Sequence, residues 1–136
     1  MFERFTERAV NVVYEAQRVA EEMMSPEVFP EHLLLALVNE AKGVSLKIFR
    51  MYGLTSDIVK SEVVKYTQKS SKTLQSIPFS HSVKELLKHT LDLASKSGNN
   101  NILFEHLFLS VIADKNSNIQ NAADKLKNTN FITGMI

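Results

Sequence analysis

The chain has 136 residues, of which 44% are hydrophobic and 23% charged, with 16 Lys and Arg against 15 Asp and Glu and no Cys. These values predict one soluble globular domain with a sizeable core, and they exclude disulfide frameworks, thiolate zinc sites and Cys nucleophiles. A net charge of +1 argues against nucleic-acid binding, and no apolar run approaches the roughly 18 residues of a membrane span. We therefore expect neither nucleic acid nor membrane as a partner. The charged and aromatic opening residues differ from a signal peptide and indicate a protein that is not secreted.

Two halves of the chain repeat one another. Phe5-Thr6 recurs as Phe79-Ser80, and Glu31-His32-Leu33 recurs as Glu105-His106-Leu107, in both cases 74 positions later. Apolar positions between these anchors keep the same register, which predicts a tandem duplication. The predicted divisions of this single domain, residues 1–136, are repeat one (about 5–66), a linker (67–78) and repeat two (about 79–136).

The first repeat is predicted to be helical. After Thr6, whose hydroxyl suits an N-cap, apolar residues recur at the i, i+3, i+4, i+7 spacing of one helix face. The apolar run from 33 to 38 indicates a short central helix buried on all sides. A buried strand is the alternative, which the lack of β-rich neighbours disfavours. Two shorter helices are expected over about 44–51 and 56–66.

The second repeat follows the same plan. Ser80 takes the place of the N-cap, an apolar stripe runs from 83 to 94, and the run from 107 to 112 predicts the second buried central helix. The stretch from Asn128 onward is short and poor in helix formers. We predict an all-α fold of two four-helix repeats related by a pseudo-twofold axis, with the last helix short or missing.

Sequence patterns of catalysis are absent. The glycines at 43, 53, 98 and 134 leave no room for a phosphate-binding loop of the Walker type, and there is no zinc-protease or nucleophile-elbow motif. A two-histidine metal site formed by His32 and His106 is conceivable, but histidines at helix starts are more often satisfied by backbone or solvent. We expect a non-catalytic domain with no metal and no cofactor of its own.

Binding is the function that the duplicated residues favour. Thr6 and Ser80 each open a helix, and the free N–H groups at a helix N-terminus attract anions. Glu31 and Glu105 each open the helix behind. If Thr6 lies near Glu31, and Ser80 near Glu105, each pair suits a ligand that carries an anion and a cation together. Simple capping is the alternative role for Thr6 and Ser80.

The sequence resembles the Clp N-terminal double-repeat domain, most of all that of the ClpC type of AAA+ unfoldase. The resemblance is carried by the opening from Met1 to Ala9, the motifs at 31–35 and 105–109, the segment 77–80 and the period of 74 residues. It implies an eight-helix domain on a hexameric ATPase ring, where adaptor proteins and substrates are received for unfolding and delivery to the ClpP protease. ATP would then bind elsewhere in the parent protein. The cytoplasm, or alternatively the plastid stroma, is the implied compartment.

The resemblance also implies a ligand. Clp domains of this type recognise phosphoarginine once in each repeat, and the matching residues here are Thr6 with Glu31 and Ser80 with Glu105. The sequence departs from the family pattern at Phe29-Pro30, Leu103-Phe104 and His81-Ser82. Three aromatic residues form a candidate adaptor surface, although their places at helix starts also suit packing in the core. They are Phe2, Phe5 and Phe79.

A second function remains open at this point. The same fold could belong to a free-standing accessory subunit or adaptor that docks on the Clp protease machinery.

Overall fold

The computed structural model describes residues 2–51, 53–67, 69–70 and 77–113. Within these ranges the chain forms α-helices and no β-strand longer than an isolated bridge. The helices are α1 (Glu7–Glu22), α2 (Pro30–Glu40), α3 (Gly43–Met51), α4 (Ser56–Tyr66), α5 (His81–Lys96) and α6 (Phe104–Ala113). The predicted all-α fold is confirmed. The two last helices expected in repeat two lie outside the described residues.

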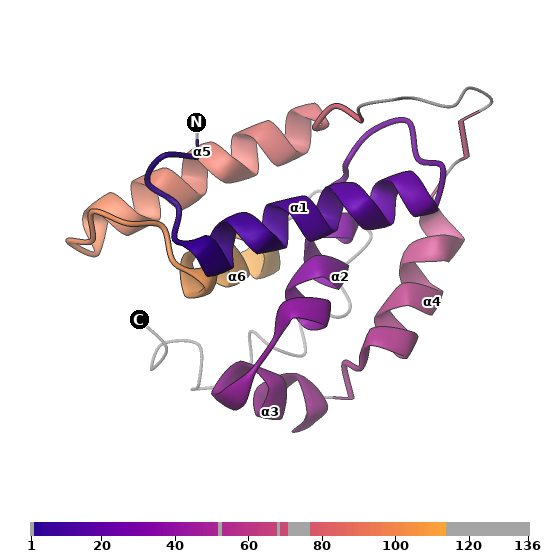
Figure 1. Cartoon of the computed structure of the whole chain (residues 1–136), viewed down its shortest axis with the longest axis horizontal. Coiled ribbons are helices and arrows are strands. Elements are labelled where there is room, and N and C mark those ends of the chain that lie inside the picture. Colours follow the sequence, from indigo (N-terminus) through magenta and orange to yellow (C-terminus); the bar gives the residue numbers. More distant parts are fainter. Residues whose placement is uncertain (1, 52, 68, 71–76, 114–136) are drawn as a thin grey trace.

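Helix α1 buries the apolar stripe that its sequence predicts. Thr6 begins the helix as its N-cap, and the stripe faces α2 and α6. In Figure 1 α1 lies between α5 on one side and α2 on the other. The buried residues of the stripe are Ala9, Val12, Val13, Ala16, Val19 and Ala20.

Helix α2 is the central element of the fold. Every residue from Pro30 to Val38 is buried, because α1, α4, α5 and α6 all pack around this helix. A run that is apolar on every face needs such complete covering. The helical interpretation of residues 33–38 is therefore confirmed, and the strand alternative is wrong.

Helices α5 and α6 repeat the packing of α1 and α2. Thr90 Oγ1 joins them, lying 2.8 Å from Ser110 Oγ and 2.8 Å from the carbonyl oxygen of Leu86. Phe108 of α6 also makes an edge-on contact with Phe49 of α3, with ring centroids 5.3 Å apart. The core is therefore shared between the two repeats.

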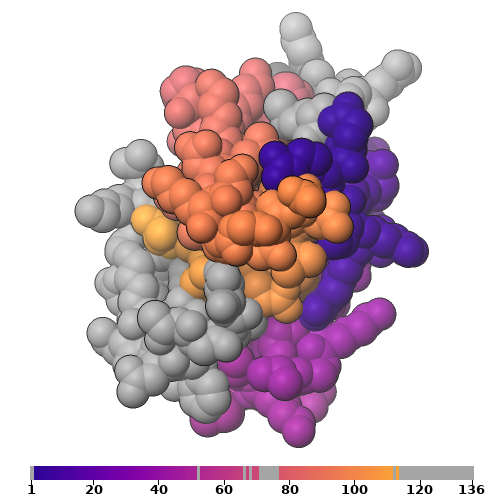
Figure 2. Space-filling view, turned by 90° about the vertical axis from the view of Figure 1, so that its left-hand side faces the viewer, coloured from indigo at the N-terminus to yellow at the C-terminus, as the bar shows by residue number. Residues whose placement is uncertain are grey.

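Two isolated β-bridges join the backbones of the two repeats. Phe5 forms a parallel β-bridge with Ile102, and Val28 forms the equivalent bridge with Phe79. In Figure 2 the indigo N-terminal segment lies directly against the orange residues around position 100. Each bridge leads directly into a helix N-terminus, so these crossings position the residues on which the functional hypothesis depends.

Candidate functional site

The N-termini of α1 and α5 are copies of one another. Thr6 Oγ1 accepts a hydrogen bond from the Ala9 N–H at 3.2 Å, and Ser80 Oγ accepts one from the Val83 N–H at 3.1 Å. Both caps have extended backbones, with φ of −65° in each case and ψ of 161° and 162°. Each cap leaves the N–H groups of the first two helical residues without an acceptor inside the helix. Both predicted caps are present, and both ends can attract an anion.

The charges in the two first turns differ. Glu7 places an acidic side chain in the first turn of α1, whereas the first turn of α5 contains no acid. The α5 turn instead begins with His81 and Ser82. An anion is therefore more favoured at the start of α5 than at the start of α1.

Glu31 and Glu105 occupy the first turns of α2 and α6. Glu31 is buried, and the Glu105 side chain is 28% exposed. Each glutamate lies three residues after a carbonyl that accepts a hydrogen bond from the N–H of an N-cap residue. The Ser80 N–H donates to the Val28 carbonyl at 3.0 Å, and the Thr6 N–H donates to the Ile102 carbonyl at 3.0 Å.

The pairing of caps and glutamates crosses between the repeats. Thr6 of repeat one is tied to the segment that leads to Glu105, and Ser80 of repeat two is tied to the segment that leads to Glu31. Treating each repeat as a unit predicted that Thr6 pairs with Glu31 and that Ser80 pairs with Glu105. The backbone bonds instead pair Thr6 with Glu105 and Ser80 with Glu31.

The course of α1 explains why Thr6 is remote from Glu31. Sixteen helical residues separate Thr6 from Met23, about 24 Å at the rise of an α-helix. Thr67 Oγ1 lies 3.9 Å from Met23 Sδ and 3.5 Å from His32 Nε2. These contacts show that α2 begins near the Met23 end of α1. Glu31 therefore lies near the end of α1 that Thr6 does not occupy.

Arg8 fills the first of these composite sites. Its guanidinium lies 4.1 Å from the centroid of the Phe104 ring, and its Nη1 is 3.9 Å from Glu105 Oε1. Its Nη2 donates to Ser45 Oγ at 3.1 Å. The Arg8 Nε is buried with no hydrogen-bond partner among the described residues. The spacing of the sequence did not indicate the contact between Arg8 and Glu105, which are 97 positions apart.

The second composite site has different side chains at the matching positions. The repeat places Ser82 at the position of Arg8 and Pro30 at the position of Phe104, each 74 residues away. A serine cannot supply a guanidinium, and a proline offers no aromatic face for a cation. The two sites share a cap and a carboxylate but differ in what surrounds them.

His32 and His106 cap the central helices in an unexpected way. The N-cap residues Phe29 and Leu103 have no side-chain acceptor, but their N–H groups donate to His32 Nδ1 and His106 Nδ1, each at 2.9 Å. The histidines therefore take the third helical position that Glu or Gln holds in a capping box. This geometry leaves the ring proton on Nε2 in both histidines.

Both histidines are fully buried and neutral. Burial lowers the pKa of His32 to about 4 and lowers the pKa of His106 despite the nearby charge of Glu105. Among the residues that the structure describes, no group of three or more His, Asp and Glu side chains could hold a metal ion.

The aromatic residues Phe2, Phe5 and Phe79 cluster at the junction of the repeats. The Phe2 ring makes edge-on contacts with Phe5, at a centroid distance of 5.0 Å, and with Phe79, at 6.2 Å. Phe5 is only 8% exposed and belongs to the core, while Phe2 and Phe79 are half-buried. Phe2 and Phe79 thus keep part of the surface predicted for an adaptor.

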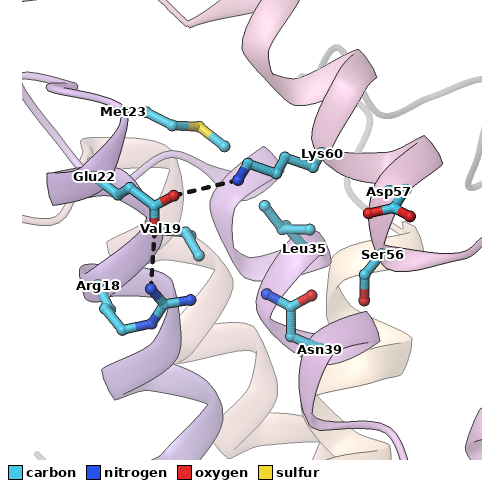
Figure 3. A pocket seen from close by; sticks show the side chains of 9 residues that line it. All are labelled: Arg18, Val19, Glu22, Met23, Leu35, Asn39, Ser56, Asp57 and Lys60. Atoms are coloured by element: carbon cyan, nitrogen blue, oxygen red, sulfur yellow. Dashed lines mark hydrogen bonds and ion pairs between the residues drawn. The ribbon is translucent and has the colours of Figure 1, made fainter.

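A cleft that the sequence did not predict lies between α1, α2 and α4 (Figure 3). Its volume is about 210 Å³, with Val19 and Leu35 among the residues that line it. Glu22 bridges it by accepting hydrogen bonds from Arg18 at 2.9 Å and from Lys60 at 3.2 Å. These two cations lower the Glu22 pKa, with Lys60 making the larger contribution.

The chain belongs to the Clp repeat (R) N-terminal domain family, whose model matches residues 4–126. It is 32% identical over 114 residues to the negative regulator of genetic competence ClpC/MecB of Bacillus subtilis, and 34% identical over 115 residues to the chloroplastic chaperone protein ClpC1 of Arabidopsis thaliana. Each match covers 84% of this chain, but only 14% and 12% of the two relatives. The predicted resemblance to the ClpC type is confirmed.

Solved structures share the fold. The N-terminal domain of the chaperone ClpD from Arabidopsis thaliana matches 98% of this chain, and 92% of the ClpD chain, with a TM-score of 0.76 and 24% identity. A ClpV N-domain in complex with a VipB peptide matches 91% of this chain and 72% of that chain, with a TM-score of 0.65 and 21% identity. In the part of the chain that the structure describes, no helix is both long and apolar enough to span a membrane.

Proposed function

We propose that this domain recruits proteins to a ClpC-type, ATP-driven unfoldase that delivers them to the ClpP protease. The relatives in sequence include Clp chaperones and an ATP-binding subunit of the ATP-dependent Clp protease, and one structural neighbour is a ClpV N-domain in complex with a peptide. In this proposal ATP is bound by other parts of the parent protein and the domain itself is non-catalytic. Because the relatives are bacterial and chloroplastic, we place its function in the cytoplasm or the plastid stroma.

The proposed mark on the recruited protein is phosphoarginine. The observation that carries this proposal is that the N-termini of α1 and α5 are each joined by backbone hydrogen bonds to a segment that leads to a first-turn glutamate. The N-terminus attracts the phosphoryl group, and a carboxylate binds a guanidinium through two parallel hydrogen bonds. In a phosphoarginine side chain the phosphoryl group is bonded directly to a guanidinium nitrogen, so both groups are presented together.

The crossed pairing sets the residues to be tested. Ser80 and Glu31 form one candidate site, and Thr6 and Glu105 form the other. Both repeats must therefore be folded together for either site to exist. Phe2 and Phe79 are the remaining candidates for adaptor contact.

The test is calorimetric titration of free phosphoarginine into the domain. We expect saturable heat in the wild type, no heat with unmodified arginine, and a loss of at least tenfold in affinity in Glu31→Gln, which removes the charge and keeps the side-chain shape. Far-UV circular dichroism confirms that each variant is folded. Absence of heat when phosphoarginine is titrated into the wild type at millimolar concentration contradicts this choice of ligand.

A further inference from the structure

We infer that the cleft between α1, α2 and α4 binds a lysine side chain of a partner protein, with Asp57 as the counterion of that lysine. The site is separate from the N-caps of α1 and α5. The inference rests on the proposed recruitment of proteins, but not on phosphoarginine as the mark. It depends on the floor of the cleft, the balance of its charges and the acceptors that line it.

The cleft has an apolar floor and room for a long side chain. Val19 and Leu35 line it and are almost fully buried, at 3% and 1% exposure. Its volume of about 210 Å³ is several times the roughly 30 Å³ that one water molecule occupies in the liquid. The aliphatic stem of a lysine can therefore lie on this floor while the charged end stays near the rim.

One carboxylate of the cleft has no cation beside it. Arg18 donates to Glu15 at 2.9 Å and to Glu22 at 2.9 Å, and Lys60 donates to Glu22 at 3.2 Å. Among the described residues, the Asp57 side chain, which lines the cleft from α4, makes no ion pair and no hydrogen bond. Three carboxylates therefore accompany two cations, and the cleft favours one further positive charge.

The position of Asp57 on α4 keeps this charge in place. Asp57 lies in the first turn of the helix, where the helix dipole favours a carboxylate, and Thr55 is the N-cap. The dipole carries only a partial charge and does not replace a counterion. Asp57 is exposed, so an incoming cation can reach it.

The acceptors around the cleft suit an ammonium group. The Asn39 Nδ2 donates to Glu15 at 3.0 Å, and the other end of its amide, the oxygen, points toward Ser56 and Asp57 in Figure 3. An ammonium group has three rotatable donors, whereas a guanidinium presents a planar fork that matches a single carboxylate. The cleft also holds one lysine already, because Lys60 extends along it to Glu22 (Figure 3).

The repeat fold does not require these charges. The half-exposed pairs of Glu22 with Arg18 and Lys60 contribute little to stability. Positions 15, 18 and 22 of α1 match positions 89, 92 and 96 of α5, which hold different residues, namely His89, Asp92 and Lys96. Stability alone therefore does not account for the arrangement in the cleft.

The first experiment compares two peptides. ¹H–¹⁵N correlation spectra of the whole chain are recorded during titration with the capped tripeptide Gly-Lys-Gly, whose only charge is the ammonium group. The control peptide carries norleucine, which keeps the four-carbon stem without the charge. We expect saturable shifts at the amides of residues 56–60 and at the Asn39 side chain, with a dissociation constant about fivefold lower for the lysine peptide. No shift at these positions, or equal dissociation constants for the two peptides, overturns the inference.

The second experiment removes the counterion. Asp57→Asn keeps the size of the side chain, and Asp92→Asn is the matched control, because Asp92 is an exposed aspartate on α5 and its loss changes the net charge equally. We expect Asp57→Asn to bind the lysine peptide about fivefold more weakly than the wild type, and the control to bind it equally well. Far-UV circular dichroism confirms that both variants are folded. Unchanged binding in Asp57→Asn, or the same weakening in the control, overturns the inference.

A parallel titration with phosphoarginine separates this inference from the proposed function. Phosphoarginine is expected to shift the amides of residues 80–83, and the lysine peptide those of residues 56–60. Lysine binding in the cleft without phosphoarginine binding supports the inference and contradicts the proposed mark alone. Phosphoarginine shifts at 80–83 without lysine shifts at 56–60 support the proposed mark and overturn the inference.

Discussion

At the residue scale, His32 and His106 combine two roles that usually belong to different side chains. Each caps a central helix by accepting a backbone N–H, and each fills a fully buried place in the core. A protonated ring could not accept at Nδ1, so the capping bond exists only in the neutral form. The stability of the domain should therefore depend on pH.

The first prediction concerns that dependence. The pKa of His32 is about 4 in the folded chain and 6.5 as its ordinary value, because burial disfavours the charged form. Between these values the unfolded chain binds more protons, so stability is complete above pH 6.5 and falls as the pH drops toward 4. We expect a loss of about 2 kcal/mol between pH 7 and pH 5 from this residue.

Urea unfolding of the wild type and His32→Gln at both pH values checks this prediction. Glutamine at the third helical position can still accept the N–H of Phe29 but does not titrate. Most of the loss of stability between pH 7 and pH 5 should therefore disappear in His32→Gln. An unchanged pH dependence in this variant would show that another group is responsible.

The second prediction concerns Met24, which has a φ of 56°. The repeat places Gly98, with a φ of 76°, at the matching position, where the left-handed conformation costs nothing extra. Met24 is 48% exposed, so few contacts are lost on truncation. We expect Met24→Gly to stabilise the fold by roughly 0.5 kcal/mol in urea unfolding, after the greater chain entropy of glycine is deducted.

The matched control is Gly98→Ala. A Cβ at Gly98 would meet no atom within 4 Å, so any loss comes from the backbone conformation alone. We expect a destabilisation of about 1 kcal/mol. A destabilised Met24→Gly together with a neutral Gly98→Ala would refute the strain argument.

At the scale of the element, the N-caps differ in burial although their geometry is the same. The bond from Val83 to Ser80 is buried, and that from Ala9 to Thr6 is only partly buried. The third prediction is that Thr6→Ala costs about 1 kcal/mol and Ser80→Ala about 2 kcal/mol, because the freed N–H of Val83 cannot reach water. Equilibrium unfolding of both variants gives the comparison, and an equal or greater loss in Thr6→Ala contradicts it.

The helices were largely predictable from the sequence, and the reason is local. The cap at Thr6, the stripe behind it and the range 56–66 depend on residues within a few turns of one another, and all appear in the structure. The capping role of His32 was not predictable in this way, because histidine is not part of the usual capping pattern at the third helical position. The predicted linker over 67–78 includes positions 68 and 71–76, which lie outside the described residues.

At the scale of the whole molecule, the repeats exchange the halves of their sites. A period of 74 residues identifies which positions are equivalent, but it does not say whether a cap meets the glutamate of its own repeat or of the other. That choice depends on the backbone bridges of Phe5 with Ile102 and of Val28 with Phe79. Both are tertiary contacts between distant residues, so the candidate residues could be named from the sequence while their pairing could not.

The crossed arrangement makes ligand binding a property of the intact domain. Among the described residues, the backbone bonds of Thr6 and Ser80 join each cap to the segment that leads to the glutamate of the other repeat. The shared core, with Phe49 against Phe108, holds the two repeats in the arrangement that both sites require. Binding and folding of the whole domain should therefore be lost together.

The most direct measurement of the central claim is a set of ¹H–¹⁵N correlation spectra of the wild-type domain during titration with phosphoarginine. The account predicts that the amides of Glu31, His32 and residues 80–83 shift together with one dissociation constant, and that any shift of the amides of residues 6–9 follows that of the Glu105 and His106 amides. Shifts that join residues 6–9 to Glu31, or no shift at any of these amides, would contradict it.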